Sequence, residues 1–200
     1  MLTTTLRSIK EIYGYSVCAA DFSAGEIKEF YVDSKQWKIA SISVGRGPEP
    51  ESRIQISPEV LEEIDSPQRT FFTQLTPGEL EQGVFPSRVV GKKSSWLPAG
   101  KLLQYTAYAS DQPLGRVTDL LVNDADLGIR YLAVRVDALD KQFLLSPWNV
   151  GALKRRPLEL VLRCAFEEVC RGPEYNFSVP VSREIENLLQ EQYGKPLFWV

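Results

Sequence analysis

An internal repeat is the feature that most constrains the fold of this chain. Residues of the first half recur ninety positions later, in the same order and at the same spacing. Further along the chain the spacing of the repeat is one residue shorter, since Ser57 and Pro58 correspond to Ser146 and Pro147. A duplication therefore predicts two halves with the same fold. The identities that carry the first register are Tyr15, Ala19, Asp21, Gly25, Val32, Ile39 and Val44, which recur as Tyr105, Ala109, Asp111, Gly115, Val122, Ile129 and Val134.

Chain length agrees with this division. The 200 residues accommodate two domains of roughly 80 to 90 residues each. We therefore assign residues 1–88 to the first repeat, residues 89–100 to a linker, and residues 101–200 to the second repeat with a C-terminal helix. Each repeat is small enough that it buries only a modest core.

Short runs of β-branched and aromatic residues, separated by turns, indicate that each repeat is built from strands. Asp21–Gly25 and Asp111–Gly115 are typical of hairpin turns that place a glycine in the left-handed conformation. About five short strands per repeat follow, at the spacing of a small barrel or sandwich. Thr76 and Glu79 form a helix capping box, and a C-terminal helix begins at Ser182. The predicted fold class is mainly β.

Composition narrows the range of functions. The chain has 23 Lys and Arg against 26 Asp and Glu, and the halves share the net charge of −3 almost evenly, so nucleic-acid binding is not expected. The chain has no histidine, which excludes Ser-His-Asp and Cys-His catalysis and His-containing zinc sites. We therefore expect no enzyme activity, no cofactor and no metal site.

The cysteines and the amino-terminal segment favour a cytoplasmic protein. Cys18, Cys164 and Cys170 cannot all pair within the chain, and we expect reduced thiols. Met1–Val17 includes charged residues and lacks a continuous apolar stretch, so neither a signal peptide nor a membrane span is expected.

Three charged motifs have simpler interpretations than a catalytic or ligand site. Asp111, like Asp21, is favoured at the start of a turn by backbone hydrogen bonding alone. Asp124–Gly128 is similar to the start of a calcium-binding EF-hand loop. Counted from Asp124, however, the twelfth position of such a loop is Arg135, where a glutamate is required to bind calcium. Lys154–Arg156 is a basic run typical of a solvated face or of a gatekeeper beside a strand.

Several segments resemble the PRC-barrel family. Leu6–Tyr15, followed by an aspartate, a glycine and an apolar strand, is similar to the opening of that family's domain, and Leu102–Val136 is similar again. Pro173–Tyr175 and Tyr193–Trp199 resemble the tail of two-repeat bacterial members named after the H subunit of the photosynthetic reaction centre. The resemblance covers nearly the whole chain. It implies two tandem small β-barrels, with short helices at the ends of the repeats and a C-terminal helix.

The resemblance also implies a function in protein binding. The H subunit uses its barrel to cap a membrane complex and to help proton delivery to a quinone, and ribosome maturation factors use a similar barrel to hold a ribosomal protein. We therefore expect a non-enzymatic adaptor or assembly module that binds another protein or protein complex. The alternative is an H-subunit-like role at a quinone-containing membrane complex, in which carboxylates such as Asp119, Asp124 and Asp126 relay protons.

Four aromatic residues are the candidates for partner binding: Trp96, Trp148, Phe198 and Trp199. Trp96 lies in the expected linker and Trp148 follows the Ser-Pro that ends a strand, so each would either face a partner or join the two repeats. Phe198 and Trp199 are costly to leave in water, and we expect them to dock on a repeat or on a second chain. A homodimer is therefore an open alternative.

Overall fold

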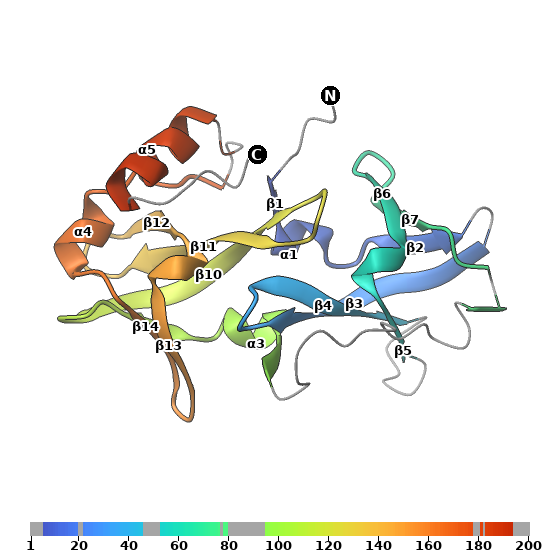
Figure 1. Ribbon diagram of the computed structural model, residues 1–200, viewed down its shortest axis with the longest axis horizontal. Helices are drawn as coiled ribbons and strands as arrows, with labels where there is room; N and C mark the ends of the chain where they lie inside the picture. The colour runs from blue at the N-terminus through green and yellow to red at the C-terminus, as the bar shows by residue number, and fades with distance from the viewer. Residues whose placement is uncertain are drawn as a thin grey trace. The chain divides into compact units, whose positions relative to one another are not determined.

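Two β-sheets dominate the structure (Figure 1). The computed structural model describes residues 6–19, 22–45, 53–76, 78–79, 95–177, 181 and 183–193. Within these ranges the chain is mainly β, and its helices are short. The mainly β part of the expected fold class is therefore confirmed.

The first sheet has seven strands. Their bounds are β2 Ser16–Ala19, β3 Phe22–Asp33, β4 Lys38–Gly45, β5 Arg53–Ile56, β6 Leu61–Asp65, β7 Thr70–Thr73 and β8 Trp96–Pro98. They lie in the order β5–β4–β3–β2–β7–β6, with β8 added beside β3. β2 and β7 run parallel, and the other neighbours are antiparallel.

The second sheet also has seven strands and repeats this order. Their bounds are β1 Leu6–Ser8, β9 Thr106–Tyr108, β10 Pro113–Asn123, β11 Ile129–Val136, β12 Lys141–Leu145, β13 Val150–Arg155 and β14 Leu158–Leu162. They lie in the order β12–β11–β10–β9–β14–β13, with β1 added beside β10. The parallel pair is β9 and β14.

Equivalent turns show that the repeat extends to backbone detail. Trp37 and Leu127, ninety residues apart, both take the left-handed conformation, with φ of 51° and 53°. Pro58 and Pro147 each begin a short 3₁₀ helix, Pro58–Val60 and Pro147–Asn149. Their separation is one residue shorter than the ninety residues between Trp37 and Leu127. The change of spacing predicted from the sequence is therefore present in the structure.

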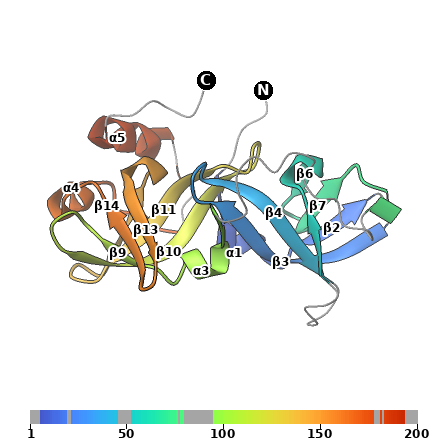
Figure 2. The same cartoon turned by 60° about the horizontal axis from the view of Figure 1, so that its bottom comes forward.

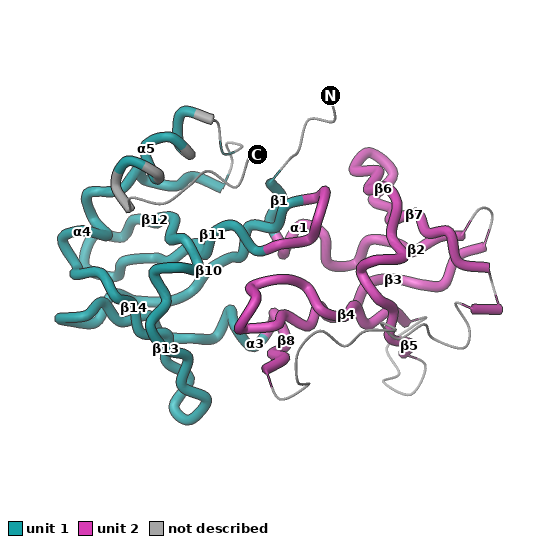
Figure 3. The backbone as a smooth tube through the Cα atoms, in the orientation of Figure 1, with its two compact units in different colours: residues 1–8, 101–123, 129–200 teal, residues 9–100, 124–128 magenta. Residues whose placement is uncertain are grey.

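The chain forms two compact units that do not follow the repeat boundary (Figure 3). Unit 2 contains residues 9–100 and 124–128, and unit 1 contains residues 1–8, 101–123 and 129–200. β1 therefore belongs to the unit that holds the strands of the second repeat. The turn between β10 and β11 belongs to unit 2, where Ile39 N donates a hydrogen bond to Leu127 O at 3.0 Å.

The two repeats exchange equivalent strands. β1 and β8 occupy equivalent positions, ninety residues apart, yet β1 pairs with β10 of the second repeat and β8 pairs with β3 of the first. The registers are also equivalent, because Leu6 lies opposite Asn123 and Trp96 lies opposite Asp33. Each sheet is thus completed by the strand that precedes the other repeat, which is the pattern of a reciprocal strand swap within one chain.

Each unit has its own apolar core. In unit 2, the buried rings of Tyr15 and Phe71 pack edge to face, with centroids 5.9 Å apart. In unit 1, helix α5 (Arg183–Tyr193) packs through Leu189 and Ile185 on the sheet. The predicted C-terminal helix and its packing on the second repeat are therefore confirmed. The cluster beneath α5 contains Leu121, Tyr131, Ala133, Leu144 and Tyr175.

The strand count differs from the expectation of about five per repeat. The sequence analysis missed β6 and β13, whose charged residues hide their alternation, and it missed the short exchanged strands β1 and β8. Strand pairing among the described residues does not close either sheet on itself. The Thr76 capping box is confirmed, since Glu79 N donates to Thr76 Oγ1 at 3.3 Å and Thr76 N donates to Glu79 Oε2 at 2.8 Å.

Candidate interaction surfaces

Trp148 is the candidate residue whose side chain the structure exposes. Ser146 caps the 3₁₀ helix that contains it: Trp148 N donates to Ser146 Oγ at 3.4 Å, and Asn149 N donates to Ser146 O at 2.9 Å. Pro147 is buried and fixes the first position of this helix. The tryptophan side chain is 55% exposed. A short capped helix therefore holds a large aromatic side chain at the surface.

The equivalent turn of the first repeat carries a charge in place of the aromatic ring. Ser57 caps it in the same way, accepting a hydrogen bond from Glu59 N at 3.4 Å. Glu59 is exposed, and it stands where the second repeat has Trp148. The two repeats thus have the same backbone conformation at this turn but expose different side chains, a glutamate in the first repeat and a tryptophan in the second.

Trp96 lies in a different environment. It is the first residue of β8, it is half-buried, and it lies opposite Asp33 of β3. Its indole Nε1 is buried and has no acceptor within the described ranges. Its place in a paired strand, rather than in an extended linker, favours a packing role in unit 2. Phe198 and Trp199 lie outside the described residues.

Three further large apolar side chains are exposed within the described ranges, and they were not among the candidates. They are Leu139 at 44%, Phe177 at 72% and Leu188 at 52%. Leu188 adjoins the buried Leu189 on α5, at the margin of the apolar stripe of that helix. No sequence signal separates Leu188 from its buried neighbour, because both fit the helical apolar pattern.

A carboxylate lies at the same irregularity of both sheets. Glu29 in β3 and Asp119 in β10 are ninety residues apart, and each follows a shift of register against the neighbouring strand. Phe30 N donates to Glu29 Oε1 at 2.9 Å, and Leu120 N donates to Asp119 Oδ1 at 2.8 Å. Both carboxylates therefore satisfy backbone donors that a β-bulge exposes.

The same two carboxylates bind the segments that are exchanged. Ser8 Oγ, at the end of β1, donates to Asp119 Oδ2 at 2.5 Å. Gly100 N, just after β8, donates to Glu29 Oε1 at 3.2 Å, and Tyr13 donates its hydroxyl to the same oxygen. Glu29 and Asp119 thus hold the exchanged strands in place, and this structural role accounts for the buried Asp119.

The other two carboxylates of the expected relay belong to a turn. Gly128 N donates to Asp126 Oδ1 at 2.9 Å, which closes the turn that Asp124 begins. Asp124 and Asp126 belong to unit 2 and Asp119 to unit 1, so no single unit contains the three. Within the described residues, no group of three or more acidic or cysteine side chains is arranged to hold a metal ion.

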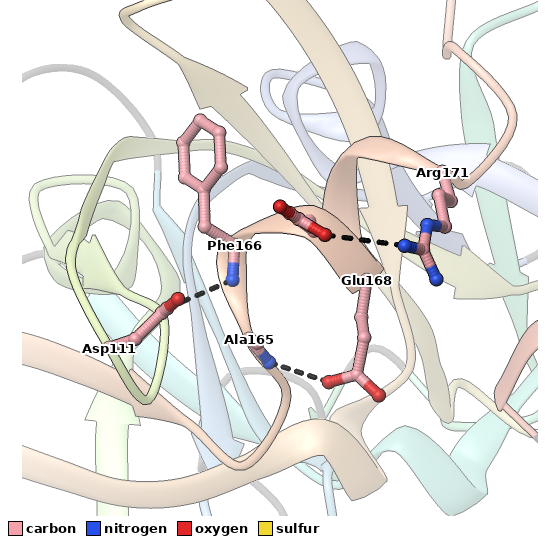
Figure 4. A network of polar contacts seen from close by, with 6 residues as sticks. Asp111, Ala165, Phe166, Glu168 and Arg171 are labelled. Carbon is pink, nitrogen blue, oxygen red and sulfur yellow. Dashed lines mark hydrogen bonds and ion pairs between the residues drawn. The ribbon is translucent and has the colours of Figure 1, made fainter.

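Asp111 also has a structural role (Figure 4). Its Oδ1 accepts a hydrogen bond from Phe166 N at 2.9 Å, at the start of helix α4 (Phe166–Cys170). Glu168 Oε2 accepts a second one from Ala165 N at 2.6 Å. Asp111 therefore does bind a backbone donor, but the donor that the structure shows belongs to a helix far along the chain and not to the turn that the sequence predicted.

Burial perturbs two tyrosines. It raises the pKa of Tyr13 far above its usual range, and the hydrogen bond to Glu29 and the charge of Glu29 raise it further. Burial also raises the pKa of Tyr105, and the charge of Arg155 opposes this. The Tyr105 hydroxyl is buried without an acceptor among the described residues. In both tyrosines, burial therefore favours the neutral form of the hydroxyl.

Stability is expected to fall as the pH rises above about 10, where tyrosines of an unfolded chain ionise. The pKa values of Tyr13 and Tyr105 are raised in the folded chain, so each tyrosine contributes stability that is complete below that pH. This stability is lost as the pH rises toward the folded-state pKa, by at most about 1.4 kcal/mol per pH unit for each tyrosine. Urea unfolding from about pH 8 to about pH 11 measures this loss. Tyr105→Phe should reduce the slope, and equal slopes in the two proteins would contradict the assignment.

Comparisons with known proteins identify no relative: no family model matches the sequence, and no curated protein matches it significantly. Within the described ranges, no helix is both long enough and apolar enough to cross a membrane.

Proposed function

We propose that the chain is a non-enzymatic adaptor or assembly module of the PRC-barrel type, with two small barrels and with another protein as its partner. The observation that carries this proposal is the exposed Trp148, held on a capped turn whose counterpart in the first repeat carries Glu59. Tryptophan is enriched among the residues that contribute most to protein–protein binding. A binding role would explain why the second repeat exposes a tryptophan on a turn that has the same backbone conformation in both repeats.

The roles of the acidic residues support a non-enzymatic function. Glu29, Asp119 and Asp111 each accept hydrogen bonds that hold strands or a helix in place. Asp119 is one of the three carboxylates of the alternative proton relay, and here it accepts hydrogen bonds from Ser8 and Leu120. No observation among the described residues favours the alternative of proton delivery to a quinone, and we do not develop it.

An affinity capture from the organism's own cells tests the proposal. Trp148→Ala is expected to weaken capture of the principal partner by about 30-fold or more, because truncating a central aromatic residue typically costs about 2 kcal/mol or more of binding. The matched control is Glu59→Ala, which changes the equivalent position of the other repeat and should leave capture unchanged. Equal capture by both variants would remove Trp148 from the binding surface and, with it, the support for the proposal.

A further inference from the structure

Two of the four strands that end the sheets, one in each sheet, carry opposite charge. β6 ends the path of one sheet and β13 ends the path of the other, and the two strands are equivalent in the repeat. β6 contains Glu62, Glu63 and Asp65. β13 contains Lys154 and Arg155, and Arg156 follows it. The two repeats have therefore diverged in charge at the same structural position.

These charges lie at the surface. Glu62, Glu63, Lys154 and Arg155 are all exposed. Lys154 Nζ contacts Glu159 Oε2 of the neighbouring strand at 2.7 Å, yet the lysine side chain remains 55% exposed. Figure 2 shows β13 and β14 as a hairpin whose turn projects from the sheet of unit 1. Within the described chain, no strand pairs with the outer side of β6 or of β13.

Edge strands offer unpaired N–H and C=O groups to any strand that can approach them. Like charges across such a contact are destabilising, so the acidic β6 disfavours a second β6 and the basic β13 disfavours a second β13. Unlike charges favour the approach and set the register. Between these two edges, the charge pattern therefore disfavours the contact of an edge with itself and favours the contact of β6 with β13.

We propose that β6 of one copy of this chain docks antiparallel against β13 of a second copy. An antiparallel register that sets Glu63 opposite Lys154 also sets Glu62 opposite Arg155. Because the two edges differ, the contact is heterologous, and each copy keeps one edge of each kind for the next copy. Such a contact joins copies into a ring if its rotation closes and into an open chain if it does not. The proposal does not rest on the proposed adaptor function.

Sedimentation velocity of the unchanged chain tests the proposal, since salt screens contacts between exposed charges. At about 20 mM NaCl we expect the weight-average mass to rise with protein concentration, and at about 500 mM NaCl we expect the mass of a monomer. Glu62→Lys with Glu63→Lys should weaken self-association about tenfold, and so should Lys154→Glu with Arg155→Glu. A mixture of the two variants should associate, because one carries two basic edges and the other two acidic edges.

Glu184→Lys with Glu191→Lys is the matched control. It makes the same change of net charge as the β6 variant, at exposed positions of α5, and should associate like the unchanged chain. A mass that stays monomeric at low salt overturns the proposal, as does a folded mixture that does not associate. Equal dissociation of the control would also overturn it, because net charge alone would then explain the effect. The salt series tests the proposal even if a variant does not fold.

Discussion

Alanine in place of Gly115 is expected to lower the free energy of unfolding of unit 1 by about 3 kcal/mol or more. Gly115 lies in β10 with φ of +152°, and a Cβ at this position would lie 2.1 Å from Arg135 O. That oxygen belongs to the backbone of β11, so it cannot turn aside as a side chain would. The strain is relieved only if β10 and β11 separate, and their pairing runs through the centre of the sheet.

Gly151→Ala is the control for Gly115→Ala. Gly151 lies in β13 of the same unit, and its Cβ would meet the flexible Arg163 side chain at 3.2 Å and Val161 O at 3.4 Å. We expect a change within about 1 kcal/mol, because no backbone atom has to move. Urea unfolding monitored by tryptophan fluorescence gives both values. A Gly115→Ala chain as stable as the Gly151→Ala chain would show that β10 accommodates a Cβ here.

The sequence predicted the parts of the fold that depend on local pattern. The repeat located the equivalent strands and turns, and the apolar face of α5 predicted its packing on the second sheet. Left-handed Trp37 and Leu127 were beyond such reasoning, because large side chains are uncommon in that conformation and only the surrounding hairpin imposes it. Of the candidate site, Trp148 could be selected because it follows a Ser-Pro that ends a strand, but the sequence left open whether it faces a partner or joins the repeats, and the structure exposes it.

The strand exchange could not be predicted from sequence for a specific physical reason. β3 and β10 are equivalent, and so a short strand such as β1 finds the same apolar and backbone pattern in either repeat. The sequence pattern therefore favours pairing of β1 with β3 and pairing of β1 with β10 equally. The choice between them depends on the path of the chain and on contacts such as Ser8 with Asp119, which only the folded structure reveals.

Leu97→Ala is expected to destabilise the sheet of the first repeat, although residue 97 directly precedes the second. Leu97 is 3% exposed in β8 and lies opposite Val32 of β3. Its truncation should cost about 3 kcal/mol, as is typical of a buried leucine. Hydrogen exchange followed by mass spectrometry should show the loss of protection in β3 and β4 rather than in β10 and β11.

Leu6→Ala is the reciprocal variant and provides the control. Leu6 is partly buried, lies opposite Asn123, and packs against the cluster beneath α5, so its truncation should reduce protection in β10 and α5 and leave β3 unchanged. The decisive result is that Leu97→Ala reduces protection in the first repeat while Leu6→Ala reduces protection in the second. Each variant would then weaken a repeat other than the one that its strand directly precedes. If each variant instead reduced protection in the repeat that follows it, the strands would be paired within their own repeats and the exchange would be refuted.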